Sequence, residues 1–162
     1  MAKLLILIVM SGLWITLIAL QTDEEQALQL LNQSKSAVNR ATHAGAQQID
    51  LEALGDGYAR IDPEAAYAYA KAYLQSNLML DETGEPLPGS PFKEAVQVLL
   101  FDVINEDNAF PYFYTNETYH YETVLKHPGV VMIAKVTYPR AFHVLDPISW
   151  EIKGVAELVL AI

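Results

Sequence analysis

Residues 4–20 read LLILIVMSGLWITLIAL, an uncharged run that Ser11, Gly12 and Thr16 alone interrupt with small or polar side chains. As an α-helix these seventeen residues rise about 26 Å, close to the hydrocarbon thickness of a bilayer. Leu, Ile and Val fill eleven of the positions, and their transfer favours a membrane by about 3 to 6 kcal/mol. The run therefore predicts a helix that is compatible with a membrane.

The charges on either side of this run predict its orientation. Lys3 precedes it, and Asp23, Glu24 and Glu25 follow it. Positive residues stay preferentially in the cytoplasm, so we expect the N-terminus there and the rest of the chain outside. A cleaved signal peptide has the same layout, but residues 19–22 (ALQT) form a poor cleavage site. We expect an uncleaved anchor; a cleaved signal and a buried helix of a soluble protein are the alternatives.

The next segment, residues 23–48, continues the helix with an amphipathic pattern. Its apolar or small residues recur in steps of three and four, which is typical of one helical face: Ala27, Leu30, Leu31, Ser34, Val38, Ala41 and Gly45. The opposite face carries Glu25, Gln29, Gln33, Ser36, Asn39 and Arg40. We predict a single helix from about residue 3 to about residue 46, apolar all round in residues 1–22 and amphipathic in residues 23–48.

Residues 49–162 predict a separate α+β domain. Residues 50–62 form a connector, and Pro63 opens a second helix with Asp62 as its N-cap. The predicted buried stripe of that helix comprises Ala66, Tyr67, Ala70, Tyr73 and Leu74, with an end near Leu78. A Pro- and Gly-rich loop covers 81–91. Strands are expected in 93–104, 111–123, 130–138 and 148–162, so the fold class is a long helix packed on a small antiparallel sheet.

Composition excludes several functions. The chain has 162 residues, with ten Lys and Arg against twenty Asp and Glu, a net charge of −10. Without Lys3, residues 23–162 carry nine basic and twenty acidic side chains, a net charge of −11. A nucleic-acid partner is not expected, because such proteins need a basic face. Cysteine is absent, which rules out disulfides, thiolate zinc sites and iron–sulfur clusters.

Two acidic turns are candidate calcium sites, since calcium takes six to eight oxygen ligands. The first contains Asp102, Asn105, Glu106 and Asp107, and the second spans residues 81–85. An ordinary solvated turn is the other interpretation of both. His120 and Glu122 are two further candidate metal ligands if they share a strand face.

No catalytic or cofactor-binding residues are expected. The sequence has no nucleophile elbow, phosphate-binding glycine loop or HExxH motif, so we predict that the chain is not an enzyme and needs no cofactor. Residues 110–121 are rich in tyrosine, which is compatible with sheet core, a subunit interface or a carbohydrate-stacking face. Asn116, in the tripeptide Asn-Glu-Thr, fits the N-glycosylation pattern.

The chain resembles the type IV pilin superfamily, and within it the Tad-type pilin-like proteins. The likeness lies in residues 26–48 (QALQLLNQSKSAVNRATHAGAQQ), in 129–138 followed by 141–145, and in 152–158 (IKGVAEL). Many pilins carry a Glu early in the apolar segment, and this chain has none before Gln21. The resemblance implies a structural subunit whose N-terminal helices bundle in the core of an extracellular filament, with the acidic domains outside.

This interpretation assigns the helix to assembly, through Leu4, Ile8, Gly12, Ile15, Leu20, Leu31 and Val38. Ser11-Gly12 is compatible with close helix approach, with a local kink, or simply with a small residue in a plain anchor. The expected partners are identical copies in a helical homopolymer, the membrane before assembly, and pilus assembly machinery. The expected location is the cell surface. The alternative is a single-pass anchored extracellular binding or assembly module, such as a minor pilin-like component.

Overall fold

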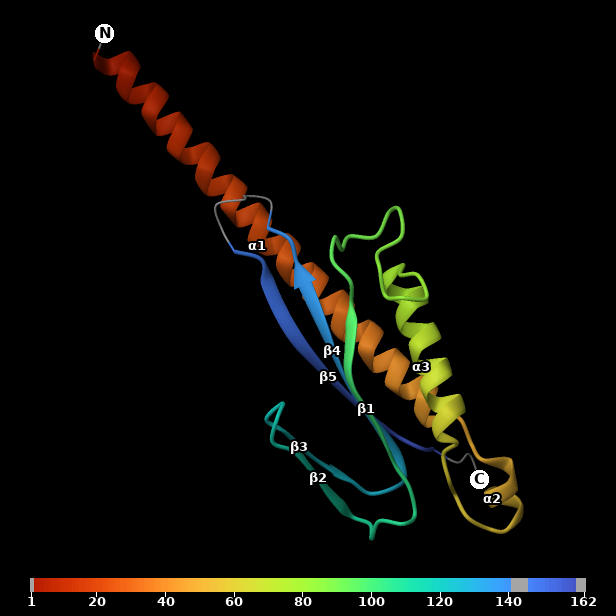
Figure 1. Ribbon diagram of the computed structural model, residues 1–162. Helices are drawn as coiled ribbons and strands as arrows, with labels where there is room; N and C mark the ends of the chain where they lie inside the picture. The colour runs from red at the N-terminus through yellow and green to blue at the C-terminus, as the bar shows by residue number, and fades with distance from the viewer. Residues whose placement is uncertain (1, 141–145, 160–162) are drawn as a thin grey trace.

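The computed structural model describes residues 2–140 and 146–159. Figure 1 shows a long helix that runs the length of the molecule, with the other elements gathered around its C-terminal half. In chain order the elements are α1 (Ala2–Ala46), α2 (Leu51–Gly55), α3 (Pro63–Leu78), β1 (Gln97–Ile104), β2 (Tyr112–Asn116), β3 (Tyr121–Leu125), β4 (Gly129–Tyr138) and β5 (Ile148–Glu157). The predicted α+β class, with a long helix on a small antiparallel sheet, is confirmed.

Helix α1 is continuous across both predicted segments, from Ala2 to Ala46. In its second half the predicted inner face is buried, apart from Leu31, which is half-buried, and every residue predicted for the opposite face is exposed. The backbone of α1 is therefore helical throughout, but its surroundings change along its length. The first half is apolar on all sides, whereas the second half has a single apolar stripe.

Helix α3 begins as predicted, but two members of its predicted stripe lie outside the core. The Asp62 side chain accepts hydrogen bonds from the backbone N–H of Glu64 and Ala65, so it caps the helix. Tyr67 and Tyr73 were expected to be buried, and their side chains are 44 % and 49 % exposed. The small residues of the stripe explain this correction: alanines let α3 pack close to α1, and the large rings then fit only at the margin of the contact.

The main sheet has the strand order β1-β4-β5, with both pairings antiparallel. The segment 111–123, expected as one strand, is instead the hairpin β2–β3, turned between Asn116 and Tyr121. Tyr114 and Leu125 of this hairpin pack with Ile104 and Val131 on one face of the main sheet. The opposite face of the sheet carries α1 and α3, so the domain has three layers.

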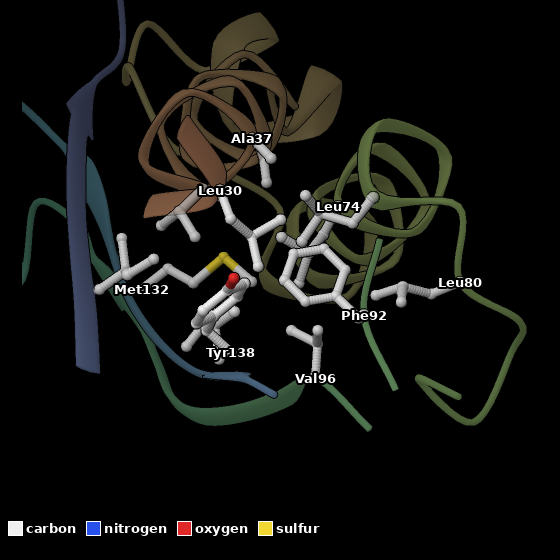
Figure 2. Close-up of a cluster of buried hydrophobic side chains, with 14 of the residues drawn as sticks. Leu30, Ala37, Leu74, Leu80, Phe92, Val96, Met132 and Tyr138 are labelled. Atoms are coloured by element: carbon white, nitrogen blue, oxygen red, sulfur yellow. The ribbon is translucent and has the colours of Figure 1, made fainter. Parts of the chain in front are cut away.

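The largest core lies between the helices and the sheet. Figure 2 shows Leu30 and Ala37 of α1, Leu74 of α3, and Met132 and Tyr138 of β4 converging on one cluster. Leu80, Phe92 and Val96, from the segment between α3 and β1, close one side of it. This packing holds the C-terminal half of α1 firmly against the domain, and the N-terminal half continues beyond it (Figure 1).

Candidate functional site

The projecting half of α1, residues 2–22, is the most unusual surface of the molecule. Its large apolar side chains are exposed from Leu4 to Leu20, and Ile15, for example, is 68 % exposed. Within the described residues, α1 is the helix that is long and apolar enough to cross a membrane. Such a surface is unfavourable in water by about 25 cal/mol for each Å². It therefore requires a membrane or another apolar surface to cover it.

The hydroxyl groups within the projecting half are satisfied by the helix itself. The hydroxyls of Ser11 and Thr16 donate to the carbonyls of Leu7 and Gly12, at 2.8 and 2.9 Å. Such bonds leave no hydroxyl that must be hydrated. A Cβ added to Gly12 would meet nothing within 4 Å, so this glycine is not required by contacts within the chain. It leaves room for the close approach of another helix.

A buried polar cluster marks the point where the projecting half meets the domain. Asp23 is only 1 % exposed. The Tyr138 hydroxyl donates to its Oδ1 at 2.8 Å, and Arg140 Nη1 lies 3.3 Å from its Oδ2. Tyr138 is the last residue of β4, so the cluster ties the helix to the end of the central strand. A buried carboxylate is tolerated only with such partners.

The surroundings of Tyr138 favour its neutral form. Burial, with the hydrogen bond to Asp23, raises the pKa of the Tyr138 hydroxyl to about 12. Its ring stacks on Trp150 of β5, with centroids 6.4 Å apart and planes inclined by 28°. The hydroxyl is therefore held as a permanent donor to Asp23 at neutral pH.

This cluster was not predicted from the sequence, where Asp23 was considered only as one of the three acidic residues that follow the apolar run. A signal was available: Asp23 lies four residues before Ala27, on the same helical face as Leu30 and Ser34. All four side chains are buried. Its partners, which lie 115 and 117 positions later in the chain, have no local signal.

The residues predicted for assembly fall into two groups. Leu4, Ile8, Gly12, Ile15 and Leu20 all lie in the projecting half and are exposed. Leu31 is half-buried at the edge of the domain core, and Val38 is fully buried within it. Val38 therefore packs inside its own chain, so its side chain is unavailable to a second copy. Of the residues predicted for assembly, the exposed ones therefore all lie in the projecting half.

The four candidate calcium ligands are not brought together as a cage. Asp102 accepts a hydrogen bond from the Tyr114 hydroxyl, and Asn105 binds the backbone of Ile61 through both its Oδ1 and its Nδ2. Glu106 pairs with Arg60 at 2.7 Å. Within the described residues no group of three or more His, Asp or Glu side chains is placed to hold a metal. The contacts of Asn105 and Glu106 instead tie the connector to the end of β1, and that of Asp102 ties β1 to β2.

The remaining candidates occupy turns. Asp81 Oδ1 accepts from the Thr83 hydroxyl and from the backbone N–H of Thr83 and Glu85, and these bonds, the Thr83 hydroxyl first, lower the pKa of Asp81. His120 lies in the hairpin turn with a φ of 46°, so the expectation that it shares a strand face with Glu122 is wrong. Asn116 Oδ1 accepts from the Tyr119 N–H. Residues 141–145, which carry part of the resemblance, lie outside the described residues.

In comparisons with known proteins, no family model, curated protein or solved structure matches this chain. The long apolar helix with a small antiparallel sheet is compatible with a pilin-like fold.

Proposed function

We propose that the chain is a structural subunit of an extracellular pilus-like filament. The observation that carries the proposal is the projecting half of α1: it is rigidly continuous with the packed half and exposes an apolar surface. In a bilayer this surface is matched by lipid. It is matched equally well by identical helices, so a subunit leaves the membrane for a bundle without losing apolar burial.

The rest of the molecule fits the outside of such a bundle. All elements other than the projecting half lie at the opposite end of α1 (Figure 1), and residues 23–162 carry the whole excess of acid. A shift along the bundle axis between one copy and the next gives a contact that does not close, and such contacts build an open helical fibre.

The test is the recovery of fibres from cells that express the chain. Surface material removed by shearing should contain filaments in negative-stain micrographs, and mass spectrometry of these filaments should return peptides of this chain. If the protein instead remains in the membrane fraction as a monomer, the alternative function, a single-pass anchored extracellular module, replaces the filament.

A substitution at Gly12 separates membrane insertion from helix bundling. Gly12→Leu keeps the segment apolar, so the chain should still enter the membrane, but its side chain should keep neighbouring helices apart and strongly reduce the fibre yield. Gly12→Ala is the matched control, since a Cβ at this position meets nothing in the chain itself. Wild-type fibre yield from Gly12→Leu would place the helix contacts elsewhere.

A further inference from the structure

Strand β1 presents an unpaired outer edge. It lies at the border of the main sheet, and alternate residues of an edge strand direct N–H and C=O groups away from the sheet. Among the described residues, nothing forms a hydrogen bond on this outer edge between Leu100 and Ile104. The strand QVLLFDVI contains neither Lys nor Pro, the residues that commonly protect an edge. The protective features that it has are a bulge between Val98 and Leu100 and the charge of Asp102.

A groove of about 580 Å³ follows this edge, with Asn108 at one margin. One wall is the start of α3, where Pro63 and Tyr67 lie and the Tyr67 ring meets Phe101 edge to face, with centroids 5.2 Å apart. The other wall is the hairpin, which contributes Tyr112 and Tyr114. The edge is therefore the floor of a groove with an aromatic wall on each side, a shape that fits one extended strand.

The groove has a distinct charge. Among the described residues that line it, Asp102 is the charged one and none is basic. The Tyr114 hydroxyl donates to Asp102 Oδ2, which fixes the carboxylate on the hairpin side of the edge and leaves Oδ1 for another donor. The net charge of −10 adds a general attraction for cations.

We propose that this groove binds an extended, basic peptide segment of another protein by β-strand addition. The segment pairs its backbone with the outer edge of β1. Because side chains alternate along a strand, a lysine or arginine on the hairpin side reaches Asp102, and its neighbours on the other side contact Tyr67 and Phe101. The residues that line the groove lie outside the projecting half of α1, so this proposal does not rest on the proposed filament.

The experiment uses the full chain in detergent micelles and a fluorescently labelled seven-residue peptide, in which a central lysine is flanked on both sides by valine and threonine. Fluorescence anisotropy measures its affinity. Two matched peptides replace the lysine with norleucine or carry N-methyl groups on alternate backbone amides. The protein variants are Asp102→Asn, which keeps an acceptor for Tyr114, and Asp56→Asn, an exposed control that removes the same charge elsewhere.

We expect the lysine peptide to bind, and Asp102→Asn to weaken it about tenfold while Asp56→Asn does not, since a bond to a charged group is lost. The norleucine peptide should be insensitive to Asp102→Asn, and N-methylation should abolish binding. Absence of binding, full binding of the N-methylated peptide, or equal affinity in Asp102→Asn would each overturn the proposal. Self-association of the chain that excludes the peptide from the groove would assign the groove to a second copy and also overturn it, whereas self-association through the projecting half of α1 should leave peptide binding unchanged.

Discussion

At the scale of single residues, Asp23 ties α1 to the end of β4 at the point where the projecting half begins. Its carboxylate is buried and is held by Tyr138 and Arg140 from the other end of the chain. The free-energy cost of removing these groups from water offsets much of the favourable free energy of their pairing. We therefore infer that the cluster positions the helix, at the point where its apolar half leaves the domain, and that its net contribution to stability is small.

We predict that Asp23→Ala lowers the free energy of unfolding of the domain by about 3 kcal/mol, because Arg140 and Tyr138 lose a buried partner. Thermal unfolding followed by near-UV circular dichroism measures this loss. The signal reports on the environment of the stacked Tyr138 and Trp150 rings, and Tyr138 contacts Asp23. Glu52→Ala, at an exposed acid of α2, is the control. Equal melting temperatures for the wild type and Asp23→Ala would contradict the assignment.

The same cluster predicts a pH dependence. The pKa of Tyr138 is about 12 in the folded chain, above its ordinary value of 10.0. Because the pKa is raised in the folded state, the contribution of the neutral Tyr138 hydroxyl to the free energy of unfolding is complete below pH 10. This contribution is lost as the pH rises through 12. The free energy of unfolding should therefore fall with pH in this window, and fall less steeply in Tyr138→Phe. Denaturant titrations at several pH values measure both slopes; identical slopes would contradict the prediction.

At the scale of elements, the contact between α1 and β5 depends on a glycine. A Cβ built on Gly154 would lie 2.9 Å from Val38 Cγ1 and 3.1 Å from Thr42 Cγ2. The strand therefore approaches the helix more closely than any residue with a side chain allows. This contact lies in the packed half of α1, so it helps to hold the domain on the helix.

We predict that Gly154→Ala destabilises the domain by about 1 to 3 kcal/mol, through overpacking against Val38. Val38→Ala, added to Gly154→Ala, should recover part of this loss, because the two changes share one space. Gly55→Ala is the control, since its Cβ would meet nothing within 4 Å. Denaturant unfolding of the wild type, the two single variants Gly154→Ala and Val38→Ala, the double variant and the control tests the coupling. Strictly additive effects would show that the strand is free to move away.

The elements also differ in how far the sequence predicted them. The extent of α1, the cap at Asp62 and the strand β4 follow from local patterns. The hairpin β2–β3 did not, because its turn, residues 117–120, contains no Gly or Pro to mark it. The positive φ of His120 shows where the chain reverses. The exposure of Tyr67 and Tyr73 depends on how closely α3 approaches α1, which no pattern within α3 specifies.

At the scale of the whole molecule, charge and apolar surface are separated. The acidic residues lie outside residues 2–22, and the exposed apolar run lies within them. In a filament, neighbouring domains with a charge of −11 each repel one another, whereas the helices attract. The balance between this repulsion and the attraction of the helices depends on salt, because salt screens the repulsion. The Debye length falls to about 10 Å at 0.1 M.

We predict that assembly of the purified chain on removal of detergent becomes more efficient as salt rises from about 20 to about 300 mM, a range over which repulsion between exposed charges is progressively screened. Sedimentation of fibres after detergent dialysis measures the assembled fraction. A fraction that is the same at both salt concentrations, or one that falls, would show that the acidic domains do not lie close together in the fibre.

The features that depend on neighbours along the chain could be predicted from the sequence. These are one long helix, the point where its apolar surface narrows to a stripe, the position of most strands and the separation of charge from apolar surface. They follow from periodicity and composition, which are local. Other features are seen only in the folded chain: Asp23 is buried, Val38 packs in the core of its own chain, and the edge of β1 lies between two aromatic walls. Each of these depends on residues far apart in sequence, and only the packing of helix, sheet and hairpin brings those residues together.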